Sequence, residues 1–212
     1  MMEDTFFFLE VIGTAAFAVS GAAAAIDKHT DIFGVIFLGM TTALGGGVIR
    51  DVFLGALPPR MFSNYIYVAV AIGVSALVFI AAQIWHEKLA GGRDAIDAVV
   101  NVFDAVGLGV FTVSGMNLAI ADDGIGNALL IIVLGMATGI GGGMLRDVMI
   151  GEIPFVLRKR IYAVASLAGA VVYYLMFMAK VNNTVGAVTG ICVIFTIRML
   201  ATAFKWSLPK VE

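Results

Sequence analysis

Two copies of one glycine-rich motif lie inside strongly apolar stretches of this chain, and they restrict its fold more than any other feature. Residues 38–51 read LGMTTALGGGVIRD, and residues 134–147 read LGMATGIGGGMLRD. Glycine weakens a helix, and an arginine within an apolar span is energetically costly. The fold must therefore supply a reason for three adjacent glycines and a partner for each Arg-Asp pair, twice.

Composition predicts a membrane environment. Hydrophobic residues make up 61% of the sequence and charged residues only 13%, with a mean hydropathy of +1.02. These values differ from those of soluble domains, and apolar runs long enough to cross a bilayer recur along the whole length. We therefore predict an all-α polytopic membrane protein with the lipid bilayer as its surrounding partner. The net charge of −2 gives no sign of a nucleic-acid partner.

Seven segments are apolar enough to span the bilayer as helices. A polar connector, His86 to Asp97, separates the third segment from the fourth. The predicted spans are residues 6–26, 32–50, 65–85, 98–121, 126–150, 161–180 and 185–204. An odd number of spans places the two termini on opposite sides of the membrane.

The two halves of the chain repeat each other beyond the glycine motif. FLEVIG at residues 8–13 matches VFDAVG at 102–107, and FAVSG at 17–21 matches FTVSG at 111–115. Each repeat holds three spans, so the two copies enter the membrane from opposite sides and form an inverted repeat. We predict a first three-helix repeat over residues 1–90, a second over 91–182, and a seventh helix with a cytoplasmic tail over 183–212.

Basic residues in the loops predict the orientation. With the N-terminus outside, Arg60 and Lys180 fall on the outer side. Eight fall on the inner side: Lys28, Lys88, Arg93, Arg158, Lys159, Arg160, Lys205 and Lys210. Because basic residues favour the cytoplasmic side, we predict an integral protein of a bacterial or archaeal cell (inner) membrane. Its N-terminus would lie outside and its C-terminus in the cytoplasm.

The glycine triplets have two interpretations. Small residues allow neighbouring helices to pack closely. Alternatively, each triplet kinks or breaks its helix near mid-membrane, which is tolerated only inside protein or beside a water-filled cavity. Discontinuous helices between inverted repeats are where transporters bind ions and substrates, and we favour this second interpretation. The six glycines are Gly45, Gly46, Gly47, Gly141, Gly142 and Gly143.

The Arg-Asp pairs also need partners within the membrane. They are Arg50, Asp51, Arg146 and Asp147. Adjacent side chains on a helix diverge by about 100°, so we expect neither arginine to pair with its own neighbouring aspartate. We expect instead an acid of the other half, or carbonyl groups freed at the glycines. Glu10 and Asp104 are candidates for this role, and equally for attracting cations at pore mouths. The arginines either pin the repeats together or lie on a conduction pathway.

Hydroxyl groups near the triplets recur in both halves. They belong to Thr41, Thr42, Thr138, Ser20 and Ser114. A single hydroxyl in a membrane helix usually bonds to its own backbone, but the recurrence favours a polar strip along a path. Phe17 and Phe111 also occupy matching positions, and we interpret them as packing residues.

Signatures of catalysis are absent from the sequence, so we predict that the protein is not an enzyme. His29 and His86 have no metal-ligand spacing around them. The glycine triplets lack the Gly-Lys-Ser/Thr ending of a phosphate loop. We expect no metal centre and no cofactor, apart from permeant potassium or sodium ions, and bound lipid stays an open alternative.

The doubled Gly-Gly-Gly-x-x-Arg-Asp motif in a seven-span chain resembles the prokaryotic trimeric intracellular cation (TRIC) channels. It is also similar to the bacterial membrane family labelled glycine-transporter domain. The resemblance extends from Phe6 to about Phe204. It implies a homotrimer in which each protomer has a pore for monovalent cations, chiefly potassium. It further implies that the second and fifth helices kink at their triplets around an hourglass-shaped path.

Two functions stay open at this point. The first is a potassium-permeable channel lined by freed carbonyls and threonine hydroxyls. The second is a secondary transporter of glycine or a similar small zwitterion, in which Glu10 or Asp104 would hold the ammonium group. We favour the channel. A third, weaker alternative is a structural membrane protein whose arginines only pin the halves together.

Overall fold

The computed structural model describes residues 2–84, 93–122, 126–158 and 161–206, and within these ranges it contains helices and no strand. Seven of the helices there are long and apolar enough to span a membrane, which confirms the predicted fold class. They are α1 (Met2–Asp27), α2 (Ile32–Phe53), α4 (Tyr65–Ile84), α6 (Arg93–Ala121), α7 (Ala128–Met149), α9 (Ile161–Met178) and α10 (Asn183–Ala203). Two one-turn helices, α3 (Arg60–Ser63) and α8 (Phe155–Arg158), follow α2 and α7.

The observed helices differ from the predicted spans mainly at their ends. Helix α6 begins at Arg93, so the last part of the expected polar connector is helical. Helix α2 continues past Arg50 to Phe53, because the arginine is buried and has partners that let the helix continue. Residues 86–92 of the connector, with the expected boundary between the repeats, lie outside the described residues. So do four residues used for the orientation: Lys88, Lys159, Arg160 and Lys210.

Short polar residues begin the motif helices and glycines end them. The side chain of Asp31 accepts a hydrogen bond from the Gly34 amide at 2.8 Å, and Asn127 caps α7 in the same way. Such caps satisfy amide groups that have no partner in the first turn. After each motif helix a glycine adopts a positive φ, +68° at Gly55 and +72° at Gly151. This left-handed conformation is the usual helix terminator, so both repeats use the same local signals.

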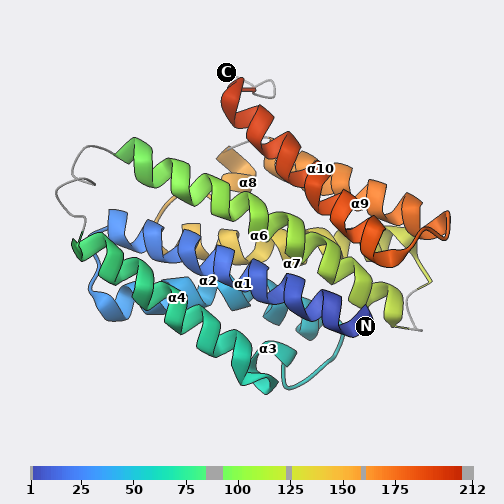
Figure 1. The fold of residues 1–212 in the computed structure, drawn as a ribbon, viewed down its shortest axis with the longest axis horizontal. Coiled ribbons are helices and arrows are strands. Elements are labelled where there is room, and N and C mark those ends of the chain that lie inside the picture. The colour runs from blue at the N-terminus through green and yellow to red at the C-terminus, as the bar shows by residue number, and fades with distance from the viewer. Residues whose placement is uncertain (1, 85–92, 123–125, 159–160, 207–212) are drawn as a thin grey trace.

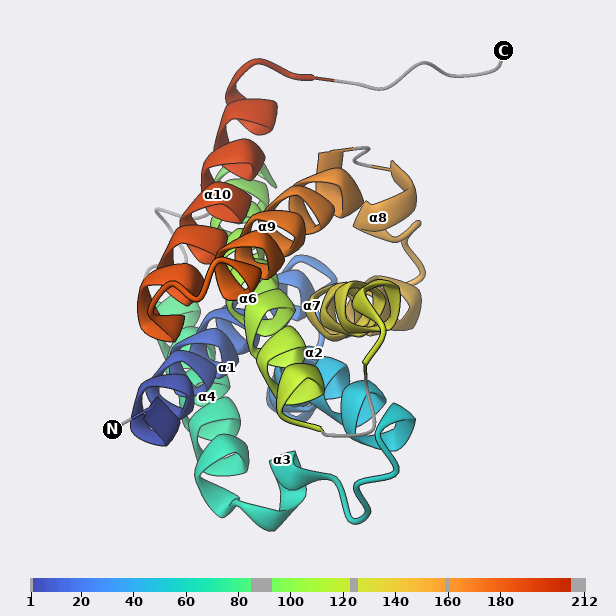
Figure 2. The ribbon, with the colours of Figure 1, turned by 90° about the vertical axis from the view of Figure 1, so that its right-hand side faces the viewer.

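The four helices α1, α2, α6 and α7 form the centre of the bundle (Figures 1 and 2). Helix α1 packs on α6, and α2 packs on α7. Helix α4 covers α1 and α2 on one side, and α9 with α10 covers α6 on the other. The first repeat is thus α1, α2 and α4, and the second is α6, α7 and α9. Helix α10 stands outside this symmetry.

Reciprocal contacts show an internal twofold axis between the repeats. A Cβ built on Gly46 would lie 2.0 Å from the carbonyl oxygen of Thr138, and one on Gly142 would lie 2.1 Å from that of Thr42. Gly46 and Gly142 are equivalent residues, as are Thr42 and Thr138. A contact that is repeated with the partners exchanged requires a twofold relation between the two units. The inverted repeat predicted from the sequence is therefore present in the fold.

Candidate functional site

The glycine triplets lie inside uninterrupted helices. Helix α2 is continuous from Ile32 to Phe53 and α7 from Ala128 to Met149. The expected helix breaks with freed backbone groups are therefore wrong, whereas a kink at each triplet stays a prediction. The close contact between α2 and α7 supports the packing interpretation, in which small residues let two membrane helices approach each other. A continuous helix keeps its backbone groups hydrogen-bonded. The role of these glycines is therefore the absence of a side chain, which gives room to the neighbouring helix.

Each glycine of the first triplet makes room for a different neighbour. A Cβ on Gly45 would lie 2.6 Å from the side chain of Leu145, and one on Gly46 would meet the backbone of α7. A Cβ on Gly47 would lie 2.6 Å from the side chain of Met61. Consecutive helical positions point about 100° apart, so the three glycines face three different neighbours. Only Gly46 faces backbone, which cannot move aside, whereas Gly45 and Gly47 face the flexible ends of side chains.

The second triplet follows the same rule with one difference. A Cβ on Gly141 would meet Ile49 at 2.7 Å, and one on Gly142 the backbone of α2. A Cβ on Gly143 would lie 3.0 Å from the Tyr162 hydroxyl and 3.1 Å from Oδ1 of Asp104. The third glycine of the second repeat therefore makes room for polar groups, where that of the first makes room for a methionine.

One charged cluster is centred on the Glu10 carboxylate and is called the Glu10 cluster. It comprises Glu10, Arg50, Asp51, Tyr67 and Ser114. The Arg50 guanidinium donates to Asp51 at 2.8 Å and to Glu10 at 3.1 Å. Tyr67 donates to Glu10 at 2.7 Å, and Ser114 donates to it at 2.5 Å. Ser114 belongs to the second repeat, so this cluster joins the two halves.

The Asp104 cluster is the counterpart in the second repeat. It comprises Asp104, Arg146, Asp147, Ser20 and Tyr162. Arg146 donates to Asp147 and to Asp104, each at 2.8 Å, and to Ser20 at 2.5 Å. Ser20 comes from the first repeat, as Ser114 comes from the second in the other cluster. The two clusters thus use equivalent residues and lie on opposite sides of the middle of the antiparallel pair α1 and α6. Their bonds differ, because Ser114 donates to the acid whereas Ser20 accepts from the arginine.

The pairing differs from the sequence expectation in two respects. Each arginine does contact its neighbouring aspartate, because the side chain is long enough to fold back over the 100° between adjacent positions. The acids Glu10 and Asp104 come from the same repeat as the arginines that they bind. The contact between halves is made by the serine hydroxyls instead.

Each motif aspartate also fixes the segment after its helix. The other oxygen of Asp51 accepts a hydrogen bond from the Arg60 amide at 2.7 Å, and that of Asp147 accepts one from the Phe155 amide at 2.7 Å. These amides open α3 and α8, respectively. The adjacent Arg-Asp pair therefore combines a charge pair with an anchor for the loop that follows.

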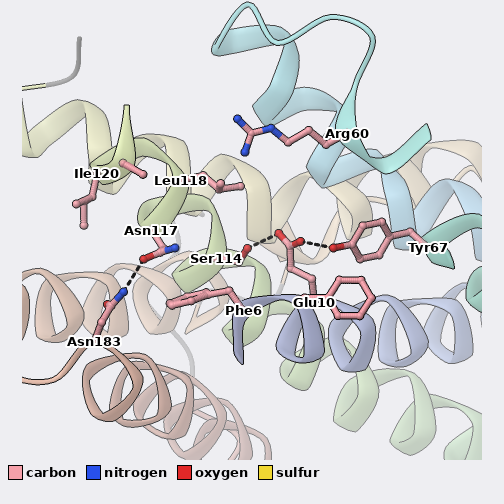
Figure 3. Close-up of a pocket in the computed structure, with 11 residues that line it drawn as sticks. Phe6, Glu10, Arg60, Tyr67, Ser114, Asn117, Leu118, Ile120 and Asn183 are labelled. Atoms are coloured by element: carbon pink, nitrogen blue, oxygen red, sulfur yellow. Dashed lines mark hydrogen bonds between the residues drawn. The ribbon is translucent and has the colours of Figure 1, made fainter. Parts of the chain in front are cut away.

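A cavity of about 500 Å³ opens beside the Glu10 cluster (Figure 3). Its polar lining is Glu10, Arg60, Tyr67, Ser114, Asn117 and Asn183, and its apolar lining includes Phe6 and Leu118. The Glu10 side chain is 12% exposed, whereas that of Asp104 is fully buried. The ring of Phe155 lies 4.8 Å from the Arg146 guanidinium and covers the Asp104 cluster. The twofold symmetry is thus broken, with one cluster open and the other sealed.

Three of the expected hydroxyl groups bond to their own helix. Thr42 donates to the Leu38 carbonyl at 2.7 Å, Thr138 to Leu134 at 2.7 Å, and Thr41 to Phe37 at 2.9 Å. Such bonds are the common state of threonine in membrane helices. The two serines differ, because they bind the charged clusters.

Sequence reasoning missed several residues of these sites. Tyr67 carries no signal of its own in the sequence, yet it binds Glu10. Arg198 of α10 is buried, donates to Asn101 at 2.7 Å and lies 4.7 Å over the Tyr162 ring. A cation inside an apolar span was the available signal for Arg198. In the sequence Arg60 indicates only the orientation, and its place at the cavity follows from the fold.

Comparisons with known proteins agree with this architecture. The family model described as Glycine transporter matches residues 7–83 and 101–178, once in each repeat. The UPF0126 inner membrane protein YadS of Escherichia coli K12 is 34% identical over 206 residues, covering 96% of this chain and 94% of that protein.

Solved structures of channels are similar over nearly the whole chain. A prokaryotic TRIC channel crystallised in 0.5 M KCl has a TM-score of 0.86 and 32% identity, covering 98% of this chain and 100% of that one. The TRIC trimeric intracellular cation channel orthologue from Rhodobacter sphaeroides has a TM-score of 0.85 and 31% identity, covering 95% and 98%. This chain is therefore an integral membrane protein that belongs to the Glycine transporter family of UPF0126 membrane proteins and has the fold of the prokaryotic TRIC channels.

Proposed function

We propose that this protein is a passive channel for monovalent cations, chiefly potassium, with one pore through each protomer of a homotrimer. The single observation that carries this proposal is the similarity of the whole chain to solved TRIC channels, at TM-scores of 0.85 and 0.86 and identities of 31% and 32%. The proposed location of the protein is a bacterial inner membrane, with the N-terminus on the outer side. This orientation rests on the distribution of loop arginines and lysines.

We place the path along α1 and α6. Its wide end is the cavity beside Glu10, which residues of α1, α3, α4, α6 and α10 line, and the Asp104 cluster lies near its other end. Polar groups that face a protein-enclosed path are how membrane proteins carry ions through the bilayer. Arg146 and Asp104 would face the narrow part of the path, beside the Phe155 ring.

The test is electrical recording from purified protein in a planar bilayer under a potassium gradient, with and without millimolar glycine. We expect unitary currents that reverse near the potassium equilibrium potential and do not respond to glycine. A silent bilayer, together with saturable glycine uptake into liposomes from the same preparation, would replace the channel by a transporter.

The second candidate function is a secondary transporter of glycine or a similar small zwitterion. One specific observation favours it: the cavity presents the Glu10 carboxylate and the Arg60 guanidinium to the same space. A carboxylate and a guanidinium suit the ammonium and carboxylate ends of an amino acid. Glu10, however, already accepts hydrogen bonds from Arg50, Tyr67 and Ser114. A bound ammonium would have to displace one of them, and for this reason we place the channel first.

Arg60→Gln separates the two functions. A unit charge about 8 Å away in water is worth about 0.5 kcal/mol, roughly twofold in local cation concentration. For a channel we therefore expect Arg60→Gln to raise potassium conductance roughly twofold at low salt, with a smaller effect at high salt. For a transporter the variant should abolish glycine uptake. Lys180 is also exposed but does not line the cavity. Lys180→Gln is therefore the matched control and should leave potassium conductance and glycine uptake unchanged.

A further inference from the structure

Two equivalent phenylalanines stack on each other at the centre of the bundle. Phe17 of α1 and Phe111 of α6 have ring centroids 5.3 Å apart and planes inclined by 16°. Their exposed fractions are 0% and 1%. Equivalent residues that contact each other lie on the internal twofold axis, because the axis exchanges them. In an inverted repeat this axis lies in the membrane plane, which places the stack near the middle of the bilayer.

Polar groups lie on both sides of the stack. Glu10 precedes Phe17 by seven residues and Asp104 precedes Phe111 by seven, which is about 10 Å along each helix. Because α1 and α6 are antiparallel, the two carboxylates lie on opposite sides of the rings. The stack therefore separates the Glu10 cluster and its cavity from the Asp104 cluster.

An unpartnered hydroxyl extends the polar side toward the rings. Thr14 is fully buried, and its hydroxyl has no hydrogen-bond partner among the described residues. Glu10, Thr14 and Phe17 follow the spacing of one helical face. A buried hydroxyl without a partner is unfavourable, and a bridging water would satisfy it. The equivalent position on the far side of the rings is Leu108, which is apolar.

Glycines lie against both rings, and one of them, Gly107, leaves no room for a side chain. A Cβ on Gly107 would lie 2.2 Å from the Phe17 ring, and one on Gly142 would lie 3.5 Å from it. A Cβ on Gly13 would lie 3.2 Å from the Phe111 ring. Rings in contact with backbone leave the centre of the path dry, and a dry apolar constriction stops ions.

We propose that the stacked Phe17–Phe111 pair is the apolar barrier that closes the ion path at the bilayer midplane. This inference rests on the proposed channel function and adds the position and chemistry of its barrier. The barrier opens when the two rings separate, which hydrates the segment between Thr14 and the Asp104 cluster.

The test measures potassium efflux from proteoliposomes containing Phe17→Ala or Phe111→Ala. We expect each variant to raise the rate at least tenfold over the wild type, since a smaller side chain lets water fill the constriction. Phe33 and Phe37 form a second stacked pair, with centroids 6.0 Å apart, on the exposed face of α2. Phe33→Ala is therefore the matched control, with the wild-type rate expected. Folded Phe17→Ala and Phe111→Ala proteins with wild-type efflux would overturn the barrier.

A labelling measurement tests the barrier first with both phenylalanines in place. Cys192 is exposed, so a Cys192→Ser background removes its reaction with silver ion, a thiol-reactive monovalent cation. We expect silver applied from the side of the Glu10 cavity to react with Thr14→Cys but not with Leu108→Cys. Adding Phe111→Ala should expose the second cysteine. Equal reaction at both cysteines with the rings intact would overturn the proposal.

Different results would overturn the Phe17–Phe111 barrier and the channel function. Wild-type potassium efflux with unchanged rates in both alanine variants overturns the barrier and leaves the channel standing. No efflux from the wild type or any variant, although the silver pattern is as expected, overturns the channel function itself.

Discussion

Gly46→Ala tests whether the glycine triplets serve helix packing. The added Cβ would lie 2.0 Å from the Thr138 carbonyl oxygen, whereas real Cβ atoms essentially never come closer than 3.0 Å, so α2 and α7 must separate by about 1 Å. Overpacking costs about 1–3 kcal/mol, and we expect about 2–3 kcal/mol here because a backbone neighbour cannot rotate away. Alanine regains about 1 kcal/mol of helix propensity. We expect a net loss of stability of about 1–2 kcal/mol.

The assay is thermal unfolding in one detergent, followed by far-ultraviolet circular dichroism. For a chain of this size about 1 kcal/mol corresponds to roughly 2–4 °C, so Gly46→Ala should unfold about 2–8 °C below the wild type. Gly73 lies inside α4, and a Cβ there would have nothing within 4 Å. Gly73→Ala is therefore the matched control and should unfold at the wild-type temperature or slightly above. Unfolding of Gly46→Ala at or above the wild-type temperature would refute the packing role.

Two further substitutions address the charged clusters and the hydroxyls. Arg146→Ala leaves two buried carboxylates without their cation and should lower stability by about 3–5 kcal/mol, seen as loss of the monodisperse peak in size-exclusion chromatography. Arg50→Ala should lower stability less than Arg146→Ala, because Glu10 is partly exposed. Equal losses of stability in the two variants would contradict this reasoning from burial. Thr42→Val should keep potassium efflux within about twofold, since this hydroxyl bonds its own helix. A large drop in efflux would instead place the Thr42 hydroxyl on the path.

Hydropathy and internal repetition were sufficient to predict the helices. The expected spans 32–50, 65–85 and 185–204 correspond to α2, α4 and α10 with small changes at the ends. Helix ends were less accurate because they depend on caps and on buried partners. Arg50, for example, would end a span in lipid, but in this fold Glu10 and Asp51 bind it and the helix continues.

The charged residues were found in the sequence, but their partners were not. Arg50 and Arg146 were recognisable as unusual because a buried cation needs compensation. Which acid, hydroxyl or amide compensates each one depends on how α1, α2, α6 and α7 cross. The link from Asp51 to the Arg60 amide could not be seen in the sequence, since it depends on the path of the loop.

The sequence by itself determined the membrane environment, the number of spans and the inverted repeat, because apolar length and self-similarity are properties of a linear chain. Only the tertiary structure decided what the glycines do. The effect of a glycine depends on which atoms of the neighbouring helix lie where its side chain would be. For Gly46 and Gly142 those atoms belong to the backbone of the other repeat, so close packing replaced the expected break. The same dependence made Phe17 and Phe111, two ordinary apolar residues in the sequence, into a single contact on the internal twofold axis.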